Sequence, residues 1–304
     1  MKNSFFFIGL TILLSHCTSS ETKESVEIIK NDQQLKPTEE FNAYWFNNEA
    51  ELTSYQLEQA RYGEVHQGNA VLIYVTEPFS EKKQVKADNP TEEDYAVLKL
   101  NFTKKFNTGI YPYSMMNSFF LPLNDLDNHL TKATSSVQEW CGHVFTQLNN
   151  KNNKWEINSY SYFETEGDNE FSISNELLED ELWLRIRTNP TALPTGKIKL
   201  IPSLFYLRLM HKELKAYTAE TSTTIENSIV IYTIKYPELE RTLSIHYQKE
   251  FPFAIDGWEE TYVSGWGENA QQLTTKATKL KTLKTDYWTK HSVQDSVLRK
   301  ELGL

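Results

Sequence analysis

Two side chains that can do chemistry lie close together in the segment Ser135–Phe145, which reads SSVQEWCGHVF: Cys141 and His143. A thiol beside an imidazole is the nucleophile of one class of hydrolases. On a strand, residues i and i+2 project from one face about 6.5–7 Å apart, but a nucleophile and its base need heavy atoms about 2.6–3.2 Å apart. The spacing therefore favours a small, inert and mostly buried cysteine on a strand, and a reactive pair is the alternative.

Other catalytic patterns are missing from the sequence. The seven histidines are scattered, and no Cys or His pair has zinc-ligand spacing with a second pair. There is no G-x-S-x-G, no glycine-rich phosphate loop and no G-x-G-x-x-G. The many carboxylates lie in polar stretches, where nothing selects two that face each other across a cleft. We therefore expect no catalytic residue, no metal site and no cofactor.

The N-terminus has the layout of a secretory signal peptide, with Lys2 followed by an apolar run from Phe5 to Leu14. This run is too short to cross a bilayer as a helix, which needs about 20 residues. The next residues, LSHC, end at Cys17 and resemble the lipobox of bacterial lipoproteins, although His16 stands where Gly or Ala is usual. The resemblance implies that the Cys17 thiol receives diacylglycerol, that the chain is cut before Cys17 and that the new amine is also acylated, for example with palmitate. An ordinary signal peptide with a chance cysteine is the alternative.

A lipid on Cys17 would place the protein outside the cytoplasm. We expect it to be exported and anchored to the outer membrane, facing the periplasm or the cell surface. Residues 18–40 are mostly polar and cannot bury enough apolar surface to offset their ordering entropy. The predicted organisation is a signal peptide over 1–16, a lipidated cysteine with a flexible tether over 17–40, and a single antiparallel β-rich domain over 41–304.

Composition narrows the possible partners. The net charge of −10 argues against a nucleic-acid partner, because phosphates would repel the protein.

With Cys17 committed to lipid, Cys141 has no partner for an intrachain disulfide. The domain must then be held together by core burial, to which the 13% aromatic content contributes.

Most of the chain after residue 50 has the pattern of strands joined by turns. Ala70–Val75 is apolar and β-branched, and Trp155–Phe163 follows the polar turn NNKNNK as the second half of a hairpin. Residues 227–262 contain three strands without a helix-length gap between them. Short connections imply antiparallel pairing. The sequence therefore predicts a mainly β fold, a large curved antiparallel sheet or half-barrel meander with a few short helices.

Helices are expected only near Phe41–Phe46 and at the C-terminus, where Ser292 and Asp295 form a capping pair and Gly303 ends the pattern. The segment Leu182–Thr188, LWLRIRT, alternates apolar and cationic residues, which predicts a half-buried strand. The lysine-rich segment 274–290 is interpreted as an edge strand protected by lysine. Contact of these lysines with anionic headgroups or an acidic partner is the alternative.

The segment NTGIYPYSMMNSFFLP, residues 107–122, concentrates aromatic and methionine side chains. If exposed, they would form an apolar rim for a hydrophobic ligand, and if buried they belong to the core. The candidate ligand-binding residues are Tyr111, Tyr113, Met115 and Phe119.

Several stretches, among them KKFNTGIYPYSMM, SSVQEWCGHVFTQLN and LERTLSIHYQKEFPFAIDGWEETY, resemble an uncharacterised family of flavobacterial-type envelope lipoproteins. Members are often labelled septum formation inhibitor Maf, but the Ser- and Arg-rich phosphate-binding start of Maf proteins is missing here. The order of IPSLFYLRLMHKELKAYTAE and the later strands is similar in pattern to lipoprotein carriers of the LolA/LolB type. That likeness implies a curved sheet around a short helix, with an apolar concave face.

Three functions remain open from the sequence. The first is a non-enzymatic, lipid-anchored envelope protein that binds an apolar or amphipathic ligand, such as a lipid, on a curved sheet. The second is a structural or interaction lipoprotein that holds another envelope protein. The third is a thiol-dependent hydrolase that uses Cys141 and His143.

Overall fold

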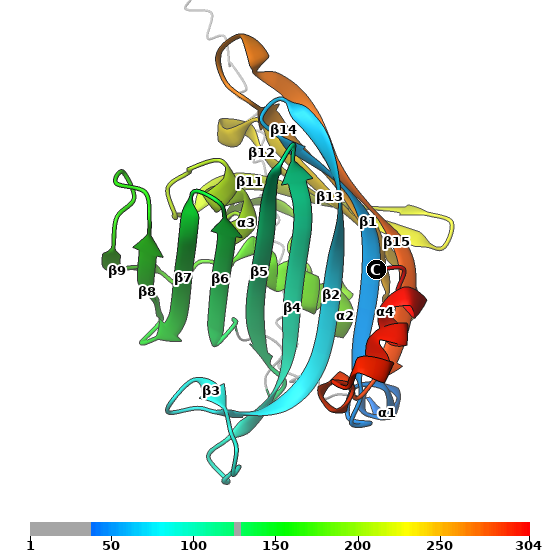
Figure 1. The fold of residues 1–304 in the computed structure, drawn as a ribbon. Helices are drawn as coiled ribbons and strands as arrows, with labels where there is room; N and C mark the ends of the chain where they lie inside the picture. Colours follow the sequence, from blue (N-terminus) through cyan, green and yellow to red (C-terminus); the bar gives the residue numbers. More distant parts are fainter. Residues whose placement is uncertain (1–37, 125–128) are drawn as a thin grey trace, which may run out of the picture. The chain divides into compact units, whose positions relative to one another are not determined.

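Fifteen strands pair into one antiparallel sheet in the part of the chain that the structure, a computed structural model, describes: residues 38–124 and 129–304 (Figure 1). The strand order is β10-β11-β12-β13-β14-β15-β1-β2-β4-β5-β6-β7-β8-β9, with β3 beside β2, and the sheet is not closed. The predicted antiparallel sheet with few short helices is confirmed. The predicted signal peptide, the lipidated Cys17 and the tether up to residue 37 lie outside the described residues.

The strands are β1 (Ala50–Arg61), β2 (Glu64–Ser80), β3 (Val85–Lys86), β4 (Tyr95–Thr108), β5 (Tyr111–Pro122), β6 (Lys132–Glu139), β7 (Gly142–Lys151), β8 (Lys154–Ser161), β9 (Asn169–Ser174), β10 (Gly196–Leu200), β11 (Tyr217–Glu226), β12 (Ile229–Tyr236), β13 (Arg241–Gln248), β14 (Ile255–Ser264) and β15 (Gln271–Thr285). The helices are α1 (Glu39–Trp45), α2 (Glu179–Thr188), α3 (Leu204–Leu209) and α4 (Val297–Glu301), with short 3₁₀ turns at 190–192, 237–239, 267–269, 287–289 and 293–296.

The two faces of the sheet differ in burial because side chains alternate along each strand. In β13 every second residue is buried, and these residues point to the inner face. Helices α2 and α3 pack against that face. Their aromatic side chains contact those of the sheet. The ring centre of Trp183 in α2 lies 5.2 Å from the ring centres of Phe102 and Trp258. The ring centre of Phe205 in α3 lies 5.3 Å from that of Phe102. The core therefore fills much of the concave side.

Helix α2 occupies the segment that the sequence predicted as a half-buried strand, so that prediction is wrong. The helix is buried on all sides from Glu179 to Arg187. The alternation of apolar and cationic residues in Leu182–Thr188 therefore does not separate a buried face from an exposed one. Arg187 donates two hydrogen bonds to Glu51, of 2.7 and 2.6 Å. The cationic positions thus meet buried carboxylates and do not face solvent.

The first turn of α2 contributes three buried carboxylates, those of Glu179, Asp180 and Glu181. Glu179 accepts hydrogen bonds of 2.5 and 2.7 Å from Arg241, which also donates to Glu260 at 2.7 Å. Asp180 accepts from the Ser203 hydroxyl at 2.7 Å and from the Leu204 backbone N–H at 2.8 Å. Burial, reinforced by the charge of Glu179, raises the pKa of Asp180 to about 7. These contacts join the start of α2 to the start of α3.

Strand β15 lies inside the sheet, paired with β14 on one side and β1 on the other. The prediction of a lysine-protected edge strand over this segment is therefore wrong. Its lysines pair with acidic residues of β14, as Lys276 does with Glu259 and Lys279 with Asp256, both at 3.3 Å. The lysines thus lie on the solvated outer face of the sheet. Charged residues at alternate positions give the same sequence pattern there as on an edge strand.

The real edges of the sheet, β9 and β10, are joined at one end only. After β9, the Leu177 carbonyl accepts a hydrogen bond of 2.9 Å from Ile201 N–H, and Glu179 N–H donates one of 2.8 Å to the Ile201 carbonyl. These bonds form a parallel bridge between Leu178 and Ile201. Among the described residues, no ladder joins the rest of β9 to β10.

The predicted helix at the C-terminus is present as α4, preceded by a 3₁₀ turn with the expected capping box between Ser292 and Asp295. The helix lies beside β1 and β15 (Figure 1). The Ser54 hydroxyl donates to the carbonyl of Leu302, whose side chain is buried. The predicted helix near Phe41–Phe46 corresponds to α1, which Thr38 caps by accepting a hydrogen bond from Phe41 N–H at 3.1 Å.

Candidate functional site

The inner faces of β6–β9 and the helix α3 enclose a pocket of about 350 Å³. Its walls contain Val137 and Val144, which face each other across the β6–β7 ladder, together with Phe171 of β9. Leu204 and Leu207 of α3 line the opposite wall. Small-molecule sites are typically concave, largely apolar and about 300–1,000 Å³ in volume. The pocket fits that description.

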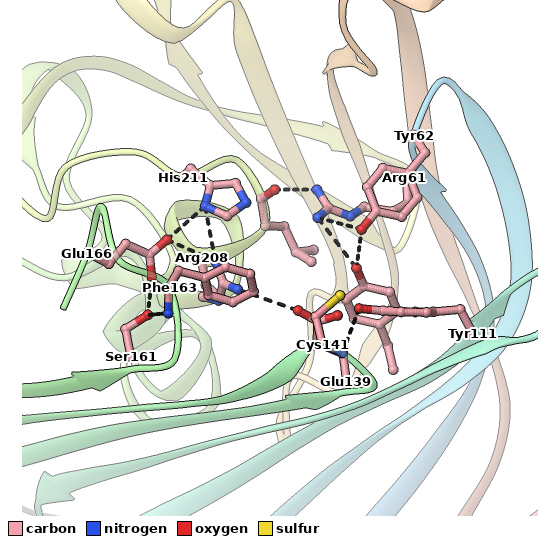
Figure 2. A network of polar contacts seen from close by, with 12 residues as sticks. Arg61, Tyr62, Tyr111, Glu139, Cys141, Ser161, Phe163, Glu166, Arg208 and His211 are labelled. Carbon is pink, nitrogen blue, oxygen red and sulfur yellow. Dashed lines mark hydrogen bonds and ion pairs between the residues drawn. The ribbon is translucent and has the colours of Figure 1, made fainter. Parts of the chain in front are cut away.

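One end of this pocket is polar, and Figure 2 shows the residues that gather there. Arg208 donates to Glu166 at 3.0 Å, and the same carboxylate oxygen lies 2.7 Å from Nδ1 of His211. The second oxygen of Glu166 accepts a hydrogen bond of 2.7 Å from the Ser161 hydroxyl. The Arg208 guanidinium lies 4.4 Å from the ring centre of Phe163. The turn between β8 and β9 is thereby tied to the end of α3.

The end of α3 explains how these side chains reach one another. His211 has a left-handed backbone conformation, with φ of 48°, a region that ends a helix. Lys212 N–H then donates to the Leu207 carbonyl at 2.9 Å, which closes the last turn. Arg208 and His211 therefore lie side by side, with their facing nitrogens 3.2 Å apart.

Three buried side-chain atoms at this end of the sheet have no hydrogen-bond partner among the described residues: Arg61 Nε, Glu139 Oε2 and Arg208 Nε. An unpaired buried polar atom costs about 1–3 kcal/mol. Two of these side chains, Arg208 and Glu139, form an ion pair of 3.7 Å. Of the three residues, only Arg208 lines the pocket.

A second group of contacts supports the neighbouring hairpin turns. The Arg61 guanidinium lies 4.2 Å from the ring centre of Tyr62 and donates to the Leu209 carbonyl at the end of α3. The hydroxyls of Tyr62 and Tyr113 are 2.6 Å apart. Burial, together with the hydrogen bond to Tyr62, raises the pKa of Tyr113 to about 12. Tyr113 therefore stays neutral at physiological pH and acts as a hydrogen-bonding group.

The four predicted ligand-binding residues have different environments. Tyr113, Met115 and Phe119 are 3%, 1% and 0% exposed, because these positions of β5 point to the inner face, where the core covers them. Tyr111 is half-buried at the start of β5 and accepts a hydrogen bond of 2.9 Å from Cys141 N–H. A role for these residues in ligand binding stays a prediction. The pocket described above is lined by other side chains.

The structure does not join Cys141 to His143. Cys141 lies in the two-residue turn between β6 and β7, where Glu139 pairs with Gly142, and its side chain is exposed. The expectation of a buried thiol on a strand is therefore wrong, because the chain reverses at this point. The His143 ring bonds to the Ser136 hydroxyl, with its Nε2 2.9 Å from Oγ. No hydrogen bond links the thiol and the imidazole in the described chain.

The sequence did not single out Glu166, Arg208 or His211 as a site. Glu166 was one of many carboxylates in a polar stretch, and nothing marked it as a partner of a helix that begins at residue 204. The apolar run around Leu204 and Leu207 was the available signal, since a run without polar positions indicates a helix buried on most sides.

Two negative findings hold for residues 38–124 and 129–304. No group of three or more His, Cys, Asp or Glu side chains in these ranges is arranged to hold a metal ion. No helix in them is long and apolar enough to cross a membrane.

Comparisons with known proteins add little to this description. No protein-family model matches the chain, and no curated protein matches it. Among solved structures, a porin-like protein from Bacteroides uniformis ATCC 8492 is similar, with 10% sequence identity over 77% of this chain and 95% of that one. The TM-score is 0.20, which is too low to support a conclusion about fold or function.

Proposed function

We propose that this protein is a non-enzymatic, lipid-anchored protein of the cell envelope that holds an amphipathic ligand in the pocket between β6–β9 and α3. The observation that carries the proposal is the pairing of mainly apolar walls with a polar end at Arg208. A single-chain lipid with a carboxylate or phosphate head has the matching chemistry, an apolar tail and an anionic end.

The head group would be recognised by the cations at the polar end. Arg208 lines the pocket, and guanidinium groups bind carboxylates and phosphates through several parallel hydrogen bonds. Lys212 also lines the pocket and adds a second positive charge. The tail would lie along Leu207 and Phe171, where burial of apolar surface contributes about 25 cal/mol per Å².

Binding is tested by displacement of a fluorescent fatty acid from the purified protein. Phe171 lines the pocket and is 39% exposed, so Phe171→Ser removes apolar contact without emptying the core. We expect about tenfold weaker binding, equivalent to about 1.4 kcal/mol. The matched control is Phe46→Ser, because Phe46 is 48% exposed and does not line this pocket.

The head-group part of the proposal is tested with Lys212→Gln. We expect it to weaken binding of the fatty acid more than binding of the corresponding uncharged alcohol, since only the acid pairs with the lysine. Equal affinities of the wild-type protein, Phe171→Ser and Phe46→Ser would count against the pocket. Lipid anchoring is tested separately by metabolic labelling with a clickable palmitate analogue, which should label the wild-type protein and leave Cys17→Ser unlabelled.

A further inference from the structure

We propose that the hairpin turns at one end of the sheet form an aromatic rim that docks on a zwitterionic lipid surface carrying ammonium head groups. The rim consists of Ile110, Trp140, Tyr162 and Trp266, which are 83%, 63%, 69% and 70% exposed. This inference goes beyond the proposed function, because it requires neither the pocket nor the lipid on Cys17.

The rim residues come from four different turns, which follow β4, β6, β8 and β14. These turns lie at the end of the sheet drawn uppermost in Figure 1, whereas α1 lies at the opposite end. Soluble proteins rarely expose large apolar patches without a binding role. Trp and Tyr are the residues that accumulate at membrane–water interfaces. Side chains that project from separate turns suit a deformable surface better than a rigid ligand.

The aromatic rim residues each contact a residue of a neighbouring turn or strand start. Tyr62 lies edge-on to Trp266 at 5.4 Å, and Tyr111 lies 6.1 Å from Trp140. Tyr162 packs directly on the backbone of Gly142, where an added Cβ would approach the ring to 2.4 Å. The aromatic rim therefore spans neighbouring turns.

The rim is also supported from beneath. Arg61 lies over the Tyr62 ring, and the Tyr62 hydroxyl bonds to that of Tyr113. The Tyr111 hydroxyl holds the backbone of the next turn through Cys141 N–H. The exposed side chains are thus presented on fixed turns, which lowers the entropy cost of docking.

Charge decides the class of lipid. The turns at 62–64, 109–110, 140–141, 162–168 and 265–270 contain no Lys, Arg or His. Their charged residues are Glu64, Glu164, Asp168 and Glu268, together with Glu166, which is paired with Arg208. An acidic surface is repelled by anionic lipids. Carboxylates and aromatic faces both attract ammonium groups. Phosphatidylethanolamine provides such a group without a net negative charge.

Intrinsic fluorescence of the full chain tests the rim directly, because the sequence has no Trp before Trp45. An anchored N-terminus therefore does not contribute to the signal. We expect vesicles of phosphatidylethanolamine and phosphatidylcholine to shift Trp emission to the blue, and brominated acyl chains to quench it. The double variant Trp140→Ser/Trp266→Ser should lose both responses. Trp288→Ser should keep them, because Trp288 is 43% exposed in the 3₁₀ turn at 287–289, outside the rim.

Circular dichroism establishes that each variant is folded. Unchanged quenching in the double variant would overturn the proposal. Stronger binding to phosphatidylglycerol vesicles than to zwitterionic ones would overturn the charge argument. A lysine-rich peptide that shifts the emission where vesicles do not would assign the rim to a cationic protein partner instead. Phe171→Ser should leave vesicle binding unchanged, which separates this test from that of the pocket.

Discussion

The carboxylate of Glu51 and the guanidinium of Arg187 form two parallel hydrogen bonds, of 2.7 and 2.6 Å, between β1 and the last turn of α2. The two side chains are 3% and 1% exposed. Burial alone would raise the pKa of Glu51, but the charge and hydrogen bonds of Arg187 outweigh it and lower that pKa to about 2. The pair therefore stays ionised inside the core at physiological pH and fastens the helix to the sheet.

Removing both partners should cost less than the sum of the two single removals. Arg187→Met leaves a buried, uncompensated carboxylate, and we expect a loss of about 3–5 kcal/mol in the free energy of unfolding. The double variant Glu51→Gln/Arg187→Met should lose less than the sum of the single variants. Urea unfolding followed by Trp fluorescence measures all three. As a control, Lys151→Met breaks an exposed pair with Glu156 of 3.0 Å and should cost less than about 1 kcal/mol. Strictly additive losses at Glu51 and Arg187 would contradict this.

Asp180 should make stability depend on pH. Its pKa is about 7 in the fold and about 3.9 in an unfolded chain, so the native state binds more protons between these values. The contribution of Asp180 to the free energy of unfolding is fully present below about pH 4 and is lost as the pH rises to about 7. Relative to wild type, Asp180→Asn should gain on the order of 2–4 kcal/mol between pH 4 and pH 8. The measurement is chemical unfolding at both pH values.

The exposed Asp88→Asn serves as the control for Asp180→Asn, and it should follow the wild-type pH dependence. Besides burial, Glu179 raises the pKa of Asp180, whereas the hydrogen bonds from Leu204 N–H and Ser203 and the charge of Arg241 lower it. A wild-type and an Asp180→Asn curve that stay parallel from pH 4 to pH 8 would show that Asp180 is ionised in the native state.

The exposed thiol of Cys141 should react with a disulfide reagent in the folded protein, without unfolding. The comparison is between the wild type and Cys141→Ser, so that the difference in labelling belongs to this residue. Because the side chain lies in an exposed turn, Cys141→Ser should change the free energy of unfolding by less than about 0.5 kcal/mol. Labelling that appears only in denaturant would mean that the turn is covered.

Gly68 should tolerate no side chain. It lies within β2, where an added Cβ would be 2.3 Å from the Lys105 carbonyl oxygen of β4. The neighbouring backbone has to shift, and we expect Gly68→Ala to cost about 1–3 kcal/mol in thermal or urea unfolding. Gly109 is the matched control, since it has open space around it and a φ of 60° that Asn accepts. A loss at Gly109→Asn as large as that at Gly68→Ala would refute the steric argument.

The local sequence pattern was sufficient to predict those parts of the fold that depend only on residues close together in the sequence. The hairpins of the segment 227–262 and the capping box at Ser292 are of this kind. Local pattern failed at α2, because Arg187 pairs with Glu51 of a strand distant in sequence and Arg185 with Glu181 one turn earlier, and the two arginines mimic strand alternation. It also failed at Trp140–Cys141, where a single pair, Glu139 with Gly142, decides between strand and turn.

The candidate site was not predictable from local pattern for the same reason. Glu166 and Arg208 belong to segments with no pattern in common, and the sheet brings them to 3.0 Å by placing β9 opposite α3. Tyr113, Met115 and Phe119 form a conspicuous cluster in the sequence, yet their register in β5 turns them into the core. Register across a sheet is set by all the strands together.

The single parallel bridge between Leu178 and Ile201 joins the two edges of the sheet, β9 and β10, at one end only. Backbone amides next to this bridge should exchange slowly with solvent. Protection from exchange should decline along β9 with distance from the bridge, because the residues of β9 are largely exposed. Bending of β8 and β9 would then widen the aperture beside Phe171 while the tryptophan-rich interior keeps its packing. For the ligand proposed above, the outermost strands would set the size limit, independently of the stability of the whole domain.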